Sequence, residues 1–383
     1  MVSLVSRGSD CAKLPGRSVR VARRVVKLPW RSGGRPRAAG AHRPPRTMER
    51  YVWYLHRTGT GSNDEGRAVS ASDNAPALGP TDPFGDPLDP ENRPARLSVG
   101  VVGTGRVGPA LGAALQLAGH RVVAASGVSA ASRRRAEALL PGVRLVTPPQ
   151  VLAAADLVLL TVPDDALADL AAGLAATGAI RPGQIVVHTS GAHGVAVLEP
   201  AARAGALPLA LHPAMTFTGT SVDLARLAGC PFGVTAPDEL RPVAEALVVE
   251  MGGEPEWVPE EVRPLYHTAL AHGANHLVTL VAQAMELLRG AGVAEPGQLL
   301  GPLLGAALDN ALRSGDAALT GPVARGDAGT LRRHLQQLRT ASPDIGQAYR
   351  AMARATAQRA VRGGPLKEEA AAALLDVLDE ETP

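Results

Sequence analysis

Cysteine is scarce in this chain of 383 residues: only Cys11 and Cys230 occur, and they lie far apart in the sequence. Two isolated thiols exclude a disulfide framework and lack the spacing of a zinc site, which favours a reducing compartment. No apolar run approaches the roughly 18 residues of a transmembrane helix. Arg23-Arg24 is not followed by the apolar segment of a secretion signal. We therefore expect a cytoplasmic protein with no membrane partner.

Excess positive charge is missing outside the N-terminus, although the isoelectric point of the sequence is about 9.1. Residues 1–50 hold 13 Lys and Arg against 2 acidic residues, and the remainder holds 26 against 34. A nucleic-acid-binding domain carries its basic residues as a patch on the fold. This distribution argues against nucleic acid as a partner, and a basic tail that binds nucleic acid stays an alternative.

Periodic patterns are absent from residues 1–95, which are rich in Arg, Gly, Pro and Asp. This composition predicts a disordered N-terminal extension. From Leu97 onward short apolar runs alternate with helical segments, which predicts βαβ units and a parallel sheet. The predicted strands are 97–102, 121–125, 157–162, 185–188, 207–211, 232–235 and 256–258, with helices at 110–117, 133–140 and 166–176.

The strand pattern ends near Pro259. Consecutive helical segments follow, separated by Gly and Pro, near 262–290, 296–313, 328–339 and 343–361. The fold class is therefore α/β, a doubly wound parallel Rossmann sheet followed by an all-helical domain. We place the Rossmann domain at 96–258, a helical substrate and dimerisation domain at 259–362, and a C-terminal tail, which could form a short helix, at 363–383.

A glycine-rich turn follows the first predicted strand and opens a helix. Its pattern, G-x-G-x-x-G, is typical of dinucleotide binding in this context, because the helix N-terminus can receive the cofactor pyrophosphate. The first glycine permits the tight turn, the second lets the pyrophosphate approach, and the third lets helix and strand pack closely. The predicted cofactor-binding residues of this turn are Gly103, Thr104, Gly105, Arg106, Val107 and Gly108.

The end of the second strand indicates which nicotinamide cofactor binds. An acidic residue there would contact the 2′-hydroxyl of NAD and repel the 2′-phosphate of NADP. Residues 125–135 contain no carboxylate, but they contain several hydroxyls and three arginines. Because arginine suits phosphate, the sequence favours NADP(H), with Ser126, Ser129 and Arg133 as candidate ligands. Which of the three arginines contacts the phosphate stays open.

Motifs along residues 97–362 resemble Rossmann-like proteins with a DUF2520 C-terminal domain, relatives of the F420-dependent NADP oxidoreductase, pyrroline-5-carboxylate reductase and ketopantoate reductase group. The resemblance implies a helical domain like the C-terminal domain of 6-phosphogluconate dehydrogenase, NADP(H) as cofactor and a homodimer. It rests on Val162-Pro163-Asp164-Asp165, His188-Thr189-Ser190-Gly191, Leu211-His212-Pro213-Ala214-Met215-Thr216-Phe217, Tyr266-His267, Asn275-His276-Leu277, Leu319-Thr320-Gly321-Pro322 and Arg325-Gly326-Asp327.

Three of these motifs fall at the carboxyl ends of predicted strands, where ligands of open parallel sheets bind. Val162, Pro163 and Asp164 are expected beside the cofactor ribose, and Asp165 is expected to cap the following helix. Ser190 and Gly191 offer a hydroxyl and a backbone N–H to the nicotinamide or to a substrate carboxylate. His212 resembles the histidine of a histidine-proline segment in related dehydrogenases, and either a ligand contact or a structural role fits it.

The helix expected from residue 262 carries further polar residues. His267, Ala271 and Asn275 repeat every four residues and share a face. Related hydroxyacid dehydrogenases carry Lys-x-x-x-Asn on the corresponding helix. Asn275 matches the asparagine, but Ala271 replaces the lysine, so His267 becomes the predicted proton donor.

Two other patterns in the helical half indicate a ligand site only weakly. His272 and His276 are four residues apart, but no third ligand accompanies them, so we predict no metal. Thr320 and Arg325 lie in a loop, where Arg325 could bind a substrate carboxylate or phosphate through paired N–H donors. A capped turn, with Asp327 as the N-cap, explains the same loop equally well.

Together these residues predict an enzyme, an NADPH-dependent oxidoreductase that reduces a carbonyl or imine of a small substrate. A 2-keto acid is favoured, with ketopantoate as the first choice, because the family resemblance points that way. The predicted catalytic residues are His267, Asn275, His212 and Ser190, and the predicted substrate ligands are Gly191, Thr320 and Arg325. A catalytically inactive NADP(H)-binding sensor or scaffold is the alternative.

Overall fold

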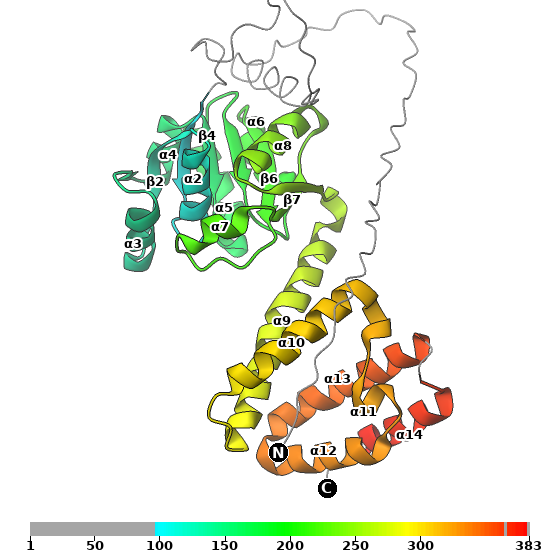
Figure 1. The fold of residues 1–383 in the computed structure, drawn as a ribbon. Coiled ribbons are helices and arrows are strands. Elements are labelled where there is room, and N and C mark those ends of the chain that lie inside the picture. The colour runs from blue at the N-terminus through cyan, green and yellow to red at the C-terminus, as the bar shows by residue number, and fades with distance from the viewer. Residues whose placement is uncertain (1–95, 364–365, 381–383) are drawn as a thin grey trace, which may run out of the picture. The chain divides into compact units, whose positions relative to one another are not determined.

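The computed structural model describes residues 96–363 and 366–380. The extension predicted as disordered, residues 1–95, lies outside the described residues. One half of the described chain is built on an eight-stranded sheet with the strand order β3-β2-β1-β4-β5-β6-β7-β8 (Figure 1). The strands are β1 (Ser98–Val102), β2 (Arg121–Ser126), β3 (Arg144–Leu145), β4 (Leu157–Leu160), β5 (Ile185–His188), β6 (Leu207–Pro213), β7 (Pro231–Thr235) and β8 (Glu254–Trp257).

The first six strands form the doubly wound Rossmann arrangement, which confirms the predicted fold class. Their pairs are all parallel, so the carboxyl ends of β1, β2, β4, β5 and β6 meet at one edge of the sheet. One expectation needs correction, because the sheet is only mostly parallel. β7 pairs antiparallel with β6, and β8 runs parallel to β7.

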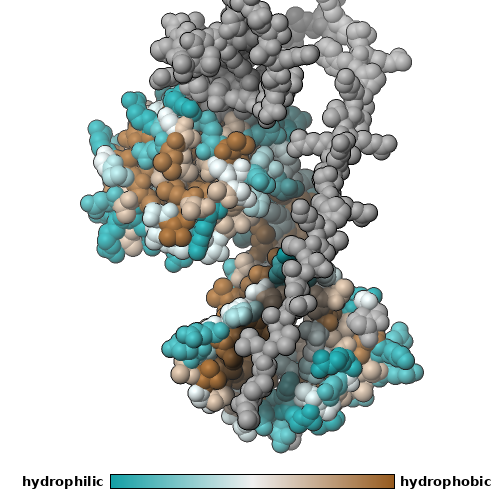
Figure 2. Space-filling view, viewed as in Figure 1, coloured by the Kyte–Doolittle hydropathy of each residue, from teal (hydrophilic) through white to brown (hydrophobic). Residues whose placement is uncertain are grey.

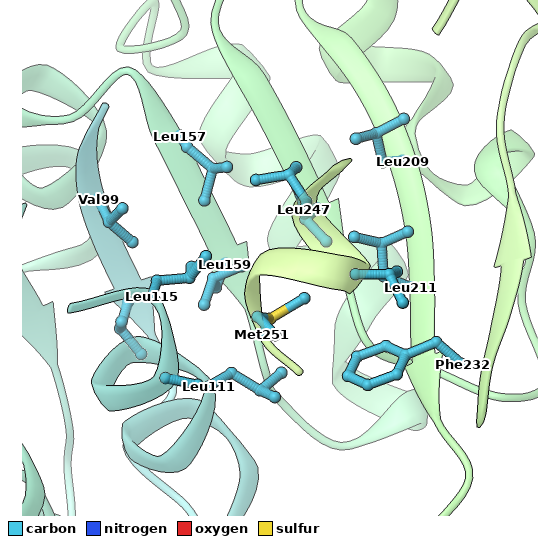
Figure 3. Packing of buried hydrophobic residues seen from close by; sticks show 14 of the residues in the cluster. Val99, Leu111, Leu115, Leu157, Leu159, Leu209, Leu211, Phe232, Leu247 and Met251 are labelled. Carbon is cyan, nitrogen blue, oxygen red and sulfur yellow. The ribbon is translucent and has the colours of Figure 1, made fainter. Parts of the chain in front are cut away.

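Helices cover both faces of the sheet, and alternate residues of each strand point to opposite faces. Val99 and Leu159 pack in one core cluster, whereas Val158 and Leu160 pack in the other. Figure 3 shows the first cluster, where side chains of the sheet meet those of α2 and α8. The helices of this half are α2 (Val107–Leu117), α3 (Ala130–Leu139), α4 (Pro148–Ala154), α5 (Asp164–Ala176), α6 (Glu199–Arg203), α7 (Val222–Leu227) and α8 (Arg241–Glu250).

After β8 the chain is helical, as predicted. The helices are α9 (Arg263–Gly290), α10 (Pro296–Ser314), α11 (Gly321–Ala324), α12 (Ala328–Ala341), α13 (Pro343–Arg362) and α14 (Glu368–Asp379). The last four share a core to which α14, in the segment expected as a tail, contributes Leu374 and Val377. None of the helices in the described ranges is long and apolar enough to cross a membrane.

α9 and α10 differ from the other helices because their own chain buries little of them. Arg263 is the one buried residue of α9, and Pro296 and Leu300 are the two of α10. Figure 2 shows hydrophobic side chains gathered over this pair of helices. The exposed leucines and valine of the pair are Leu265, Leu270, Leu277, Val278, Leu280, Leu299, Leu303, Leu308 and Leu312.

Candidate functional site

The glycine turn joins β1 to α2, and two of its glycines are required by the protein itself. Gly103 has φ +101°, and its N–H donates to the carbonyl of Ser126. A Cβ on Gly108 would lie 2.3 Å from the carbonyl oxygen of Gly103, so any side chain would push the turn and helix apart. A Cβ on Gly105 would meet nothing within 4 Å. The chain therefore gives no steric reason for glycine at 105, whereas an approaching ligand does.

Thr104 is a second indication, after Gly105, that the turn binds a ligand. Its side chain is buried, yet its Oγ1 has no hydrogen-bond partner among the described residues. Buried hydroxyls are almost always satisfied, so an orphan calls for an explanation. The first turn of α2 also has no side-chain cap, which leaves its N–H groups free to bind an anion. The residues present thus fit the phosphates of a dinucleotide.

The end of β2 lies next to this turn. A Cβ on Gly127 would lie within 2 Å of Thr104 Oγ1, so this glycine makes room for the threonine. Ser126 is buried at the strand end. The hydroxyl of Ser129 accepts the N–H of Ser132 and caps α3, and the guanidinium of Arg133 donates to the carbonyl of Val128 at 2.9 Å.

Two other arginines converge beside the glycine turn. A Cβ on Gly219, in the loop before α7, would lie 2.9 Å from Cδ and Nε of Arg135 and 3.2 Å from Cγ of Arg106. The two side chains therefore flank the same glycine. Neither arginine forms an ion pair with another described residue. Two arginine side chains that flank one glycine, with no carboxylate paired to either, are suited to an anionic ligand.

The carboxyl end of β4 contacts the same turn. Thr161 donates its hydroxyl to the carbonyl of Gly103, which ties the two strand ends together. Val162 and Pro163 follow, and Pro163 is the N-cap of α5. The prediction that Asp165 caps this helix is wrong, because Asp164 and Asp165 both lie in its first turn. In that position the two carboxylates interact favourably with the positive end of the helix dipole.

A buried histidine shapes the loop after β5. His188 accepts the N–H of Ser190 at Nδ1, and its Nε2 lies 2.8 Å from the carbonyl oxygen of Gly194. The hydroxyl of Ser190 accepts the N–H groups of Ala192 and His193. The side chain of Ser190 is therefore engaged in holding the loop. Burial, followed by the charge of nearby Arg263, lowers the pKa of His188 to about 4 against the hydrogen bond to Gly194.

Gly191 is the point at which the predicted reactive residues meet. A Cβ on Gly191 would lie 3.0 Å from Nε2 of His212 and 2.8 Å from Cδ2 of His267. The two imidazole rings are 6.2 Å apart and nearly perpendicular. Three residues predicted from the sequence thus come together at the carboxyl edge of the sheet, from the loop after β5, from β6 and from α9.

Tyr266 completes this cluster. Its hydroxyl lies 2.9 Å from Nδ1 of His212. Burial is the main reason why the pKa of His212 is lowered to about 4. The positive charges of Arg263 and His267 lower this pKa further, and the negative charge of Asp164 raises it. His212 is consequently neutral at pH 7.

Beneath the cluster lies Arg263, which is fully buried. Its guanidinium donates to the hydroxyl of Thr235 and to the carbonyls of Ser190, Ala210 and Gly233 at 2.7–3.2 Å. No carboxylate of the described residues forms an ion pair with it. Burial lowers the pKa of Arg263, but a guanidinium stays charged at neutral pH.

Three predicted residues are not brought to this cluster. Asn275 lies two turns beyond His267 on α9 and is exposed, and Thr320 and Arg325 flank α11, also exposed. Asp327 caps α12 by accepting the N–H of Thr330, which confirms the capped-turn interpretation. The capped turn does not require a ligand at Arg325.

The histidine pair of α9 forms a local contact. Nδ1 of His272 and Nδ1 of His276 lie 2.9 Å apart on the exposed helix. In the described part of the chain, no group of three or more His, Cys, Asp or Glu side chains is arranged to hold a metal ion.

Sequence reasoning did not single out Arg263, Tyr266 as a contact of His212, or the arginine pair at Gly219. Arg263 stands in a polar stretch before a proline and looks like a solvated residue from its neighbours alone. Only its partners in the loop after β5, in β6 and in β7 reveal its burial. The pairing of Tyr266 with His267 in one family motif was the one available signal.

Comparisons with known proteins agree with this architecture. Residues 84–213 match the model of a Rossmann-like domain, and residues 230–356 match a domain of unknown function, DUF2520. The chain therefore combines a Rossmann-like domain with a DUF2520 domain. No curated protein matches it.

Two solved structures illustrate the similarity of fold. One is a protein of Bacteroides fragilis described as an NADP oxidoreductase, with 23% identity and a TM-score of 0.58, covering 69% of this chain and 98% of its own. The other is a reductive aminase from Aspergillus terreus in complex with NADPH and ethyl levulinate, with 20% identity and a TM-score of 0.51, covering 74% and 99%. At such identities the likeness shows the fold alone.

The lowered pKa of His188 predicts a dependence of stability on pH. Between pH 6.5 and 4 the unfolded chain binds a proton at His188 that the native chain does not, so the free energy of unfolding falls as the pH falls through this range. The contribution of His188 is about 3 kcal/mol. His188→Gln should therefore flatten the pH dependence measured by urea unfolding at pH 7, 6, 5 and 4, whatever its effect at pH 7. A variant with the wild-type slope would contradict this account.

Proposed function

We propose that this protein is an NADP(H)-dependent oxidoreductase that reduces a carbonyl or imine of a small carboxylate substrate. The observation that carries the proposal is the meeting of His212 and His267 at Gly191, on the same sheet edge as the glycine turn. Ligands of open α/β sheets bind at this edge. A cofactor site and a pair of imidazoles at one edge are the elements that hydride transfer coupled to proton transfer requires.

The cofactor would be held by the chain's own free groups. The N–H groups of α2 and the space at Gly105 receive the pyrophosphate, and Thr104 offers its unpartnered hydroxyl. When bound, a reduced nicotinamide supplies a hydride. Val162, Pro163 and Asp164 lie at the next strand end, where we propose contact with the ribose.

The choice of NADP(H) over NAD(H) is supported by charge. The end of β2 has no carboxylate, and Arg106 and Arg135 flank Gly219 without an ion-pair partner. We therefore propose Arg135 and Arg106 as the ligands of the 2′-phosphate, with Ser126 and Ser129 beside them. Arg133, the arginine favoured from sequence, already donates to the carbonyl of Val128.

The catalytic role falls to His267, which is half-buried and keeps contact with solvent. It would donate the proton that the carbonyl oxygen or imine nitrogen takes up, and solvent would restore that proton. The buried charge of Arg263, which has no carboxylate in direct hydrogen-bond contact, favours an anionic substrate at this place. Ser190 shapes the loop that presents Gly191, and a 2-keto acid such as ketopantoate meets these conditions.

A sensor or scaffold without catalysis is the second candidate. Ala271 replaces the lysine of related dehydrogenases, and Asn275 is exposed on α9 rather than near His212. Under this candidate the dinucleotide binds, but no substrate is turned over.

A titration of the full chain with NADPH and NADH tests the cofactor site. We expect micromolar NADPH affinity, with NADH at least tenfold weaker. Gly105→Ala should weaken both cofactors without loss of stability, because its Cβ meets no protein atom. Arg135→Ala should raise the Kd for NADPH about tenfold and spare NADH, as expected for one charge-assisted contact.

Two further variants serve as controls for this titration. Arg133→Ala serves as the control for Arg135→Ala and should leave the preference for NADPH unchanged. Gly108→Ala, whose Cβ would strike the carbonyl of Gly103, should lower the melting temperature, unlike Gly105→Ala. Equal affinity for NADPH and NADH, or binding of neither, would overturn the proposed cofactor.

Turnover separates the enzyme from the sensor. NADPH oxidation is followed with a panel of 2-keto acids, including ketopantoate, and cyclic imines. His267→Gln should lower kcat by a factor of about 100, the middle of the range for loss of a general acid, and leave the Kd for NADPH unchanged. Tight NADPH binding with no turnover on any member of the panel would favour the sensor.

We also propose that the protein is a homodimer whose interface includes α9. Leu270, Leu277 and Leu280 lie on one face of this helix and are exposed in the single chain. Exposed apolar stripes of this length mark interaction sites, and closed dimers are the commonest solution.

Sedimentation velocity tests the dimer. The wild type should sediment as a dimer, and Leu277→Glu should raise the dissociation constant of the dimer at least tenfold, because a carboxylate would be buried in an apolar interface. Leu117→Glu, at an exposed leucine of α2, is the matched control and should leave the dimer intact. A monomeric wild type would contradict the proposal.

A further inference from the structure

The contact between Tyr266 and His212 joins the first turn of α9 to the end of β6. The hydroxyl lies 2.9 Å from Nδ1, and the two rings are perpendicular with centroids 5.6 Å apart. Burial raises the pKa of Tyr266, so its hydroxyl keeps its proton at neutral pH. This contact occupies the nitrogen of His212 that faces away from Gly191, and it leaves Nε2 toward Gly191.

Gly233 makes the contact possible. It is the direct partner of His212 in the pairing of β6 with β7. A Cβ on Gly233 would lie 2.5 Å from the hydroxyl oxygen of Tyr266 and 2.7 Å from its Cζ. The glycine thus provides the space in which the Tyr266 hydroxyl reaches across the strand to the imidazole.

Neutral imidazole carries one N–H, and its partner decides which nitrogen holds it. His212 is neutral because burial and the charges of Arg263 and His267 disfavour the imidazolium. A hydroxyl that donates to Nδ1 leaves the proton on Nε2. This Nε2 lies toward Gly191, on the side of the ring away from Tyr266, because a Cβ on Gly191 would lie 3.0 Å from it.

We propose that Tyr266 is a positioning residue: it donates to Nδ1 of His212, fixes the proton on Nε2, and so makes His212 a hydrogen-bond donor that selects carbonyl substrates over imines. The inference rests on the proposed function and narrows it. A carbonyl oxygen accepts a hydrogen bond throughout its reduction. An imine is reduced as its protonated iminium, whose N–H would face the N–H of His212 and whose positive charge would lie near Arg263.

The step balances with His267 as the proton source. A bound reduced nicotinamide would supply the hydride. The carbonyl π electrons would move to oxygen, and the oxygen would take a proton from the ring of His267. Solvent would replace the proton that His267 gives up. The Nε2–H of His212 stabilises the charge that develops on the oxygen and keeps its own proton.

The tautomer is measured without substrate or cofactor. In two-bond ¹H–¹⁵N correlation spectra of the full-length protein, His212, assigned by its loss in His212→Gln, should show the Nε2–H pattern. His188 is an internal reference for that pattern, because its Nδ1 accepts the backbone N–H of Ser190. Tyr266→Phe should convert His212 to a mixture of tautomers and leave the His188 signals unchanged.

A second variant disturbs the contact between Tyr266 and His212 without changing either of these residues. Gly233→Ala displaces the Tyr266 hydroxyl and should reproduce the mixed tautomers of Tyr266→Phe. An Nδ1–H pattern in the wild type would overturn the inference. So would an unchanged Nε2–H pattern in both variants.

Activity tests the substrate class. The wild type should reduce 2-keto acids with a kcat/KM at least tenfold above that for cyclic imines. Tyr266→Phe should lower kcat for the keto acid about tenfold and leave the Kd for NADPH unchanged, since one donor to the developing oxyanion is weakened. Faster turnover of cyclic imines would overturn the inference but not the proposed function. Absence of NADPH binding would overturn the proposed function, and the tautomer spectra would still decide the role of Tyr266.

Discussion

The fully buried guanidinium of Arg263 is the interaction on which the site depends. It donates to oxygens of the loop after β5, of β6 and of β7, and it does so from the first residue of α9. Each acceptor is a neutral carbonyl or hydroxyl, so the charge is solvated by the protein but is not neutralised by a directly bonded carboxylate. A buried charge held in this way is costly unless every hydrogen bond is made. The start of α9 is therefore held in one position against the loop after β5, β6 and β7.

That position has two consequences for the residues that follow. One turn of helix brings Tyr266 and His267 to His212 and Gly191, although these come from segments more than fifty residues earlier in the chain. The same positive charge disfavours protonation of both His188 and His212. The charge of Arg263 thus fixes the geometry of the sheet edge and adds to burial, which is the larger cause of the lowered pKa of both histidines. A change of Arg263 to Lys would keep the charge and lose the fork that reaches several acceptors at once.

Local sequence patterns were sufficient for the fold and for part of the site. Strand periodicity and the glycine turn predicted β1, β2 and the start of α2, since these depend on residues close in sequence. The ends of parallel strands meet at one edge, so the motifs at Ser190 and His212 could be placed together in advance. The reversal of β7 and β8 could not, because strand direction is decided by connections and packing rather than by the strand's own residues.

Partners distant in sequence explain the other differences. Arg133 and Arg135 are equivalent in the sequence, and only the folding of the Gly219 loop onto α3 distinguishes them. Helical periodicity correctly put His267 and Asn275 on one face of α9. It could not show that α9 leaves the sheet within two turns, so that His267 meets His212 while Asn275 is exposed.

Some glycines of the site are explained by packing within the chain, and others lie where a ligand could bind. The room at Gly108 is taken by the carbonyl of Gly103, and the room at Gly233 is taken by the hydroxyl of Tyr266. Packing within the chain accounts for both. The room at Gly105 is bordered by no protein atom, and the room at Gly191 is bordered by two imidazoles that carry N–H groups or lone pairs. Glycine at 105 therefore has no cause in the polypeptide alone, whereas at 191 a side chain would strike His267 and His212, and both glycines lie at the same edge of the sheet. A dinucleotide phosphate matches the free space and N–H groups at Gly105, and a carbonyl oxygen matches the imidazoles that meet beside Gly191.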